Sequence, residues 1–274
     1  MMVSRLFMRS KFAVIGGSII TLILIAAIFA PLLAPYDPKK QDIVSLLQGP
    51  STSHWLGTDE LGRDTLSRVI YGSRVSLMVG VIAVGISLFI GSTLGLISGY
   101  GRRWVDTIIM QCMDGLLAFP TIVLALAVTA MLGPSLNNAM IAIGFAGIPA
   151  FARLVRGQVL SLRNLEYVEA ARALGANHQR IVIKHILPNT MAPIIVQASI
   201  TIPAAILAEA SLSFLGLGIQ PPTPSWGAML NTARGYLQMS PWLAMMPGVA
   251  IFLTVLAFNF LGDAIRDALD PKLR

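Results

Sequence analysis

Charged residues are scarce in this sequence. Only 12% of its 274 residues are Asp, Glu, Lys or Arg, whereas soluble domains carry about 25%. A chain with so few charges lacks the polar surface that coats a soluble globule, and its mean hydropathy is +0.74. The composition therefore predicts an integral membrane protein.

Groups that bind metals, form disulfides or activate nucleotides are scarce as well. The single cysteine, Cys112, stands in an apolar segment and offers no disulfide within the chain. The histidines His54, His178 and His185 are scattered without the spacing of metal ligands. The sequence has no GxxxxGK(S/T) phosphate-binding loop, no convincing Ser/His/Asp constellation and no paired catalytic carboxylates. These absences argue against a membrane enzyme and against ATP hydrolysis by the chain itself.

Long apolar runs are what the sequence has in abundance. Each is near the roughly 20 residues that an α-helix needs to cross a bilayer. Runs rich in Leu, Ile, Ala and Gly favour helices over a transmembrane barrel, whose strands alternate weakly. We therefore predict an all-α membrane protein with about six helices. The spans are expected near residues 12–34, 76–99, 106–132, 137–156, 189–213 and 243–262.

Lys and Arg indicate the orientation, because they are more frequent in cytoplasmic loops. We attribute the net charge of +7 to such loops rather than to nucleic acid binding. The bias predicts that both termini are cytoplasmic, which an even number of spans also requires. The first span exceeds the roughly 7–15 apolar residues of a signal peptide, so we expect it to stay as an anchor. Two outer segments, near 35–75 and 214–242, and one long inner loop, 157–188, follow from this topology.

The topology divides the chain into three parts. Residues 1–72 are expected to form an anchor helix and an outer loop, 73–262 the transmembrane domain, and 263–274 a cytoplasmic tail. Several spans contain proline, which we interpret as kinks that serve packing, with a gating hinge as the alternative. These prolines are Pro120, Pro149, Pro193, Pro203 and Pro247.

The inner loop has the pattern of a short amphipathic helix. Glu169 and Arg172, three residues apart, are expected to pair on its polar side. Its apolar stripe is too weak for a firm anchor on lipid headgroups, so we expect it to bind a protein partner. A helix resting on the membrane surface is the alternative. The stripe consists of Tyr167, Ala170, Ala171 and Leu174, which recur at helical spacing.

Turn residues follow this helix. Gly175 is placed to end it in the left-handed conformation, and Asn177 is placed to cap a second helix. The second helix is expected to run from His178 to Leu187, until Pro188 interrupts it. The pattern of this loop thus predicts a helix, a turn and a second helix, which lie across the inner face.

The same loop resembles the EAA loop of ABC-importer permeases. The family pattern is Glu-Ala-Ala, three residues, Gly, nine residues, then Ile-x-Leu-Pro. His185 stands where the general pattern has Ile, a departure also found in the peptide-importing branch. The pattern is matched by Glu169, Ala170, Ala171, Gly175, Leu187 and Pro188.

Three more stretches look like the second permease of dipeptide, oligopeptide, glutathione or nickel importers. They are HWLGTDELGRDTLSRVIYGSRVSL, SFLGLGIQPPTPSWGAML and LTVLAFNFLGDAIRDALDPKLR. The resemblance covers the chain from about residue 12 to its end.

This resemblance implies a type I importer fold in a bacterial inner membrane. Two homologous but different permeases would form the pathway, and an outer substrate-binding protein would deliver the ligand. Two cytoplasmic ATPases would bind ATP and Mg²⁺, so no cofactor or metal is expected in this chain. Coupling to an ATPase would be carried by Glu169, Ala170, Ala171, Arg172 and Gly175.

The sequence says less about the cargo. We favour short peptides of the dipeptide or oligopeptide class, because no span holds a histidine or cysteine cluster that would favour metal. Nickel or glutathione import by the same architecture is the alternative. An ion-coupled secondary transporter is a further alternative, although the chain has few intramembrane acids and no obvious repeat.

Charged residues near the spans allow two interpretations each. Asp114 and Glu209 lie close to the apolar interior, and we interpret them as structurally paired or solvated at the interface, with substrate contact as the alternative. The outer stretch GTDELGRD either contacts the binding protein or braces its own loop. Its charged residues are Asp59, Glu60, Arg63 and Asp64.

The stretch QPPTPSW, which ends at Trp226, is interpreted as scaffold of the outer face, with an aromatic suited to a membrane interface.

Overall fold

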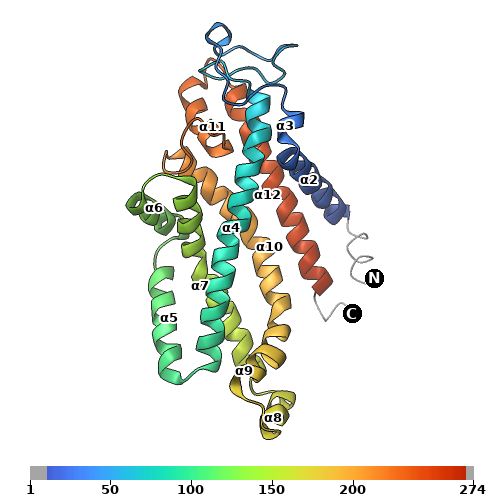
Figure 1. The fold of residues 1–274 in the computed structure, drawn as a ribbon, viewed down its shortest axis with the longest axis vertical. Helices are drawn as coiled ribbons and strands as arrows, with labels where there is room; N and C mark the ends of the chain where they lie inside the picture. Colours follow the sequence, from blue (N-terminus) through green and yellow to red (C-terminus); the bar gives the residue numbers. More distant parts are fainter. Residues whose placement is uncertain (1–10, 270–274) are drawn as a thin grey trace.

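The computed structural model describes residues 11–269, which fold into long helices joined by short turns. Three of the longest helices run side by side along the long axis in Figure 1, while one short helix and its turn extend from one end. Short 3₁₀ turns lie at Ile43–Ser45 and Arg234–Tyr236, and a π-helical turn at Val182–Ile186. The α-helices are α2 (Lys11–Ile28), α3 (Ala30–Leu33), α4 (Thr65–Tyr100), α5 (Arg103–Leu117), α6 (Thr121–Leu132), α7 (Leu136–Leu162), α8 (Glu166–Ala173), α9 (His178–Ile181), α10 (Leu187–Phe214), α11 (Trp226–Ala233) and α12 (Trp242–Leu269).

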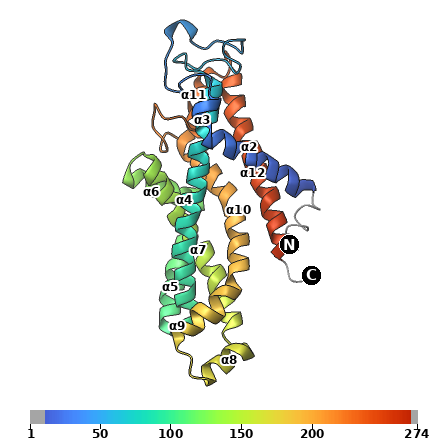
Figure 2. The same ribbon diagram turned by 45° about the vertical axis from the view of Figure 1, so that its right-hand side comes forward.

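Within the described residues, five helices are long and apolar enough to cross a membrane, and a bent pair can supply a sixth span. The bent pair is α5 and α6, whose axes differ by 91°. The span predicted near 106–132 is therefore broken rather than merely kinked, and α6 turns away from the direction of α5 in both ribbon views (Figure 2). The break falls at Pro120, which precedes α6 as its N-cap, because the residue before a proline is disfavoured in a helix.

Other helix boundaries also differ from the sequence-based prediction, as α4 and α12 illustrate. Helix α4 begins at Thr65 rather than near residue 76, because Asp64 caps it and polar residues hide its first turns from a hydropathy search. Helix α12 continues to Leu269, so the tail predicted from residue 263 begins inside a helix. The remaining residues of that tail lie outside the described part.

Pro188 does not interrupt the chain as predicted. Residues 178–214 run as one helix that contains the π turn. The N–H of Leu187 donates to the carbonyl of Val182, five residues back. Pro188 then falls in the first turn of α10, and its missing N–H is accommodated next to the π turn, where the hydrogen-bond spacing changes.

Glycines allow α4 and α7 to pack closely. A Cβ at Gly91 would lie 2.6 Å from the carbonyl oxygen of Ile148, and a Cβ at Gly95 would lie 2.6 Å from that of Ala152. Such small residues, one turn apart, let membrane helices approach each other closely. Two bonds at 2.6 and 2.7 Å between Arg156 and Asp106 attach α5 to the same pair. These three helices therefore form one tightly held body.

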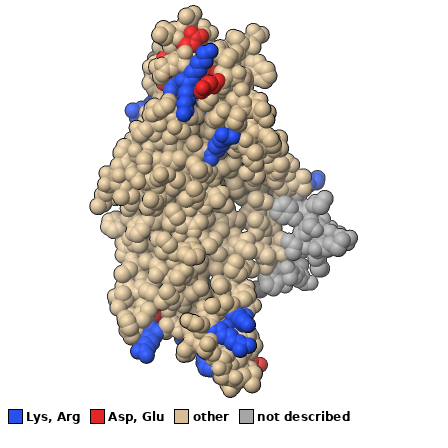
Figure 3. Space-filling view, in the orientation of Figure 1, with Lys and Arg blue, Asp and Glu red and all other residues tan. Residues whose placement is uncertain are grey.

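The surface is apolar across its middle. In Figure 3, Lys and Arg gather mainly near the two ends of the face shown, and the broad zone between them carries few charges. Large hydrophobic side chains such as Leu22, Phe89 and Phe252 are exposed on the helices of the bundle. A patch of this size would be unfavourable in water and suits contact with lipid or another membrane helix.

Candidate functional site

Helix α8 lies at the lower end of the bundle (Figure 2) and turns only one side toward the rest of the chain. Val168 fills that side, fully buried against the main core, which also contains Ile181 and Ile186. The predicted stripe faces elsewhere, since Leu174 is 89% exposed and Tyr167 is 41% exposed. Ala170 is exposed too, and Ala171 is partly buried. The stripe is therefore an open surface of small and apolar side chains.

The turn after α8 confirms the prediction made for Gly175. Its φ is +82°, a conformation that costs a residue with a Cβ about 1–2 kcal/mol. The N–H of Gly175 donates to the carbonyl of Arg172, and the N–H of Ala176 to that of Ala171, both at 3.0 Å. This pair of bonds is a Schellman motif, which satisfies the last carbonyls of the helix. An added Cβ would meet no described heavy atom within 4 Å, so the constraint is conformational rather than steric.

The helix that follows starts as predicted. The side chain of Asn177 accepts a bond from the N–H of Arg180 at 2.8 Å and so caps α9. The hydroxyl of Tyr100, at the end of α4, lies 3.1 Å from Nδ1 of His178, and the two rings are 5.6 Å apart. No sequence pattern linked these two residues, because they are brought together only by the packing of α4 against α9.

The predicted pair between Glu169 and Arg172 does not form. Among residues 11–269 neither side chain has an ion partner, and both are exposed. An exposed pair three residues apart gains only a few tenths of a kcal/mol, which hydration of the two charges can outweigh. Both charges are thus available at the surface of the loop.

The charged outer stretch is arranged differently. Arg63 lies 2.7 Å from both Asp59 and Glu60, and Arg68 lies 3.3 Å from Asp59. Asp59 is only 6% exposed and Arg63 only 3%. Burial raises the pKa of Glu60 above its usual value, and the neighbouring charge of Asp59 raises this pKa further. These side chains pair with one another within the chain, and Oε2 of Glu60 is left without a hydrogen-bond partner among the described residues.

Asp64 holds the start of α4. Its carboxylate accepts bonds from the N–H and the hydroxyl of Ser67 at 2.8 and 2.7 Å. It also lies 2.9 Å from Nδ1 of His54. His54 and Ser67 were missed as site residues. Asp64 followed three positions later by a polar residue is an N-cap signal that would have predicted the earlier start of α4.

The two acids near the spans have different surroundings. Asp114 pairs with Arg153 at 2.5 Å, and both side chains are exposed. This pair fits the structural interpretation of Asp114. Glu209 is fully buried and accepts a bond from the hydroxyl of Ser213 at 2.7 Å, while its Oε2 has no partner among the described residues.

Trp226 is buried within the protein rather than exposed toward lipid. It is 2% exposed, and its indole N–H donates to the carbonyl of Val69 at 2.9 Å. Gly72 makes room for the ring, since a Cβ there would lie 2.8 Å from Trp226 Cδ1. The ring therefore locks α11 onto α4, which fits the role of scaffold for this stretch.

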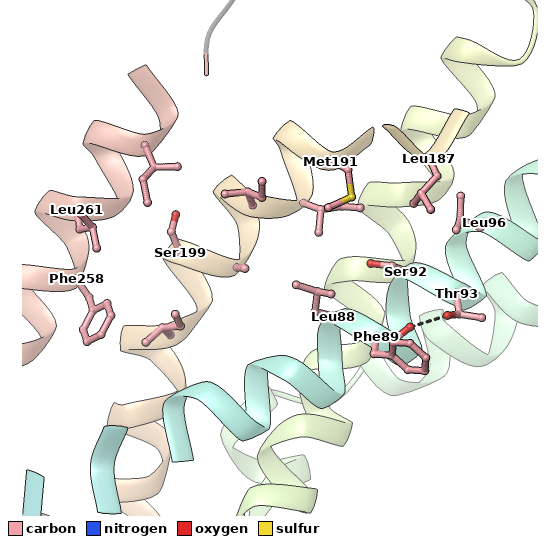
Figure 4. Close-up of a pocket in the computed structure, with 15 residues that line it drawn as sticks. Leu88, Phe89, Ser92, Thr93, Leu96, Leu187, Met191, Ser199, Phe258 and Leu261 are labelled. Atoms are coloured by element: carbon pink, nitrogen blue, oxygen red, sulfur yellow. Dashed lines mark hydrogen bonds between the residues drawn. The ribbon is translucent and has the colours of Figure 1, made fainter. Parts of the chain in front are cut away.

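A groove of about 490 Å³ lies between α4, α10 and α12. Figure 4 shows apolar side chains from all three helices lining it, among them Leu88, Met191 and Phe258. Its polar groups are hydroxyls, and that of Thr93 is already bonded to the carbonyl of Phe89 at 2.7 Å. Charged peptide termini need ionic or hydrogen-bonding partners, so the groove by itself does not constitute a peptide site.

Comparison with known families places the chain clearly. Residues 91–274 match the family described as "Binding-protein-dependent transport system inner membrane component". Residues 2–50 match the "N-terminal TM domain of oligopeptide transport permease C".

Similar proteins include two transport permeases. A dipeptide transport system permease protein of Alkalihalophilus pseudofirmus is 51% identical over 97% of this chain and 88% of its own length. A glutathione transport system permease protein of Pectobacterium atrosepticum is 51% identical over 98% of this chain and 90% of its own length.

Among solved structures, an inward-facing form of the MetNI methionine ABC transporter is similar with a TM-score of 0.62. It is 19% identical in sequence, and the match covers 75% of this chain and 97% of the other. At that identity the likeness concerns the fold, and it agrees with the type I importer fold expected from the sequence.

Proposed function

We propose that this chain, which belongs to the family of binding-protein-dependent transport system inner membrane components, carries short peptides across the membrane. It is a permease subunit of an ABC importer, a multi-pass protein of a bacterial inner membrane, and not itself an ATPase. The cargo is the part of this statement that we propose. The observation that supports it most is the 51% sequence identity, over nearly the whole chain, to a dipeptide permease and to a glutathione permease.

Glutathione import is the second candidate, because one of these two relatives is named for it. Glutathione is itself a short peptide, so both candidates need a pathway that accepts charged and amide groups together. The charged residues of this chain are largely absent from the groove. We therefore propose that selectivity resides mainly in the outer binding protein that delivers the ligand.

An importer of this family works with ATPase and substrate-binding partners. We propose that the assembly holds one copy of this chain, a homologous second permease, two cytoplasmic ATPases that bind ATP and Mg²⁺, and one outer binding protein. ATP hydrolysis would bias the permeases between two states.

We propose that the stripe of α8 is the surface on which an ATPase docks. Its alanines permit close approach, and its end carries the strongly exposed Leu174. Glu169 and Arg172 have charges free to meet a partner, and Gly175 sets the turn that aims the helix. At the outer end, we propose that Asp59, Glu60, Arg63 and Asp64 brace the start of α4 rather than contact the binding protein, because their partners lie within the chain.

The proposed cargo is tested in the complete complex, reconstituted in liposomes with its cognate binding protein. ATP-dependent accumulation of labelled dipeptides, with recovery of short peptides from the purified binding protein, is the expected result. Accumulation of glutathione alone would favour the second candidate. Uptake that persists without ATP and collapses with the ion gradient would contradict the assignment to an ATP-driven importer.

A further inference from the structure

Three polar groups meet where α8 faces the start of α10. The side-chain amide of Asn189 donates to the carbonyl of His185 at 2.7 Å. The hydroxyl of Tyr167 lies 3.4 Å from the same carbonyl, and the amide of Asn189 lies 3.3 Å from that hydroxyl. Tyr167 belongs to α8, His185 to the π turn and Asn189 to the first turn of α10.

The carbonyl of His185 stands where the helical hydrogen bonds change their spacing. Before it, Leu187 bonds five residues back to Val182. Pro188 supplies no backbone donor, and in an α-helix that donor would have paired with the carbonyl of Lys184, next to that of His185. Side-chain donors that reach a carbonyl at such a point satisfy it and stabilise the change of spacing.

Tyr167 differs in this respect from the rest of the stripe. Among residues 11–269, the side-chain hydrogen bonds that run from α8 to another helix come from its hydroxyl. The other side-chain attachment is the apolar packing of Val168. Apolar contacts have no preferred direction, whereas a hydrogen bond weakens steeply when it is misaligned. The bonds of Tyr167 therefore resist sliding of α8 along α10 in a way that Val168 does not.

We infer that Tyr167 and Asn189 are positioning residues, which transmit a displacement of α8 to α10 through the carbonyl of His185. The inference rests on the proposed docking of an ATPase on α8. Helix α10 lines the groove together with α4 and α12. A displacement of its inner end therefore alters the spacing of the helices that form the groove.

The test measures how much substrate the complete complex imports for each ATP that it hydrolyses. Tyr167→Phe removes only the hydroxyl, and Asn189→Leu removes only the amide at similar size. In liposomes that contain the partner ATPases, the second permease and the binding protein, each variant is expected to lower this ratio about two- to ten-fold. Assembly and the rate of ATP hydrolysis should stay near the unmodified level. The double variant should lose no more than the more severe single variant, because both act through one carbonyl.

Tyr236→Phe is the matched control, since it removes a hydroxyl in the outer 3₁₀ turn, at the other end of the molecule. An unchanged ratio in both Tyr167→Phe and Asn189→Leu would overturn the inference. So would an equal fall of assembly, hydrolysis and uptake, which would assign the two residues a purely structural role.

A third variant distinguishes a failure of this inference from a failure of the proposed docking of an ATPase on α8. Gly175→Val changes the turn that aims α8 while the side chains of Tyr167 and Asn189 stay unmodified. If Gly175→Val also imports and hydrolyses normally, docking on α8 is wrong. If Gly175→Val uncouples the complex while Tyr167→Phe and Asn189→Leu do not, only the transmission through His185 is wrong.

Discussion

At the outer end of the molecule charged side chains pair with one another, whereas at the inner end the charges of α8 have no ion partner among the described residues. Asp59 and Arg63 are buried and bonded, while Glu169 and Arg172 are exposed. The charges of the GTDELGRD stretch at the outer end are thus mostly paired within this chain. The inner end leaves the charges and the small apolar stripe of α8 at the surface, which fits the docking role that we propose for α8.

The largest effect on stability is expected at the outer end. Asp59→Ala leaves Arg63 and Arg68 buried without their shared carboxylate, and breaking a buried ion pair costs about 3–5 kcal/mol. Thermal unfolding of the purified complex should show a clear fall in Tm, with the import per ATP of the surviving complex unchanged. A shift that corresponds to less than about 1 kcal/mol would show that the outer end is not the scaffold described here.

A smaller effect on stability and a larger one on uptake are expected at Gly175. Gly175→Val places a β-branched residue at a φ of +82°, which costs about 1–3 kcal/mol and changes the aim of α8. Uptake should be lost while the chain remains inserted. Gly157→Val is the control, because Gly157 lies within α7 and a Cβ there meets no described atom within 4 Å. Equal uptake by the two variants would contradict the role given to the turn.

Ala171→Asp is expected to change the stability of the protein very little and its transport activity strongly. The side chain lies on the stripe and only part of it is buried, so the change in stability should stay within about 0.5 kcal/mol. A carboxylate in a docking surface adds a desolvation cost, so stimulated ATP hydrolysis and uptake should fall at least tenfold. Gln179→Asp, on exposed α9, should retain both activities. Normal uptake by Ala171→Asp would show that the stripe is not part of the docking surface.

The smallest effect is expected from Glu60, and it has the opposite sign to that of Asp59. Because burial raises the pKa of Glu60, the folded state holds the proton more tightly than the unfolded state. The associated stability is present at low pH and is lost as pH rises through the folded pKa. Glu60→Gln keeps the neutral form at every pH, so it should raise Tm slightly near pH 8. The gain should shrink as the pH falls toward about 5, and a lower Tm than the unmodified protein near pH 8 would contradict this.

Local chemistry explains what could be predicted from the sequence. The long apolar runs, the left-handed turn at Gly175 and the cap at Asn177 each depend on residues close together in the chain. Helical spacing also predicted that the four stripe residues share one face of α8, but not that Val168 holds the opposite side in the core. These features were therefore accessible before any tertiary contact was known.

Features that depend on distant residues were not accessible. The sequence marked Pro120 as a kink, but it did not predict that the bend between α5 and α6 reaches 91°. The contact of Tyr100 with His178 and that of Tyr167 with Asn189 join different helices. The predicted ion pair between Glu169 and Arg172 was wrong. Helical spacing allows the two side chains to meet, but it does not make the pair more favourable than hydration of both charges.

Site-directed cross-linking tests the central claim most directly. The exposed Cys112 is first replaced by serine, and Leu174→Cys is then combined with single cysteines on the partner ATPase in the assembled complex. Cross-links that form from Leu174→Cys and change in yield when ATP binds are the predicted result, with none from Lys39→Cys at the outer end. Absence of any cross-link from Leu174→Cys in a complex that still imports its substrate would contradict the docking of an ATPase on α8.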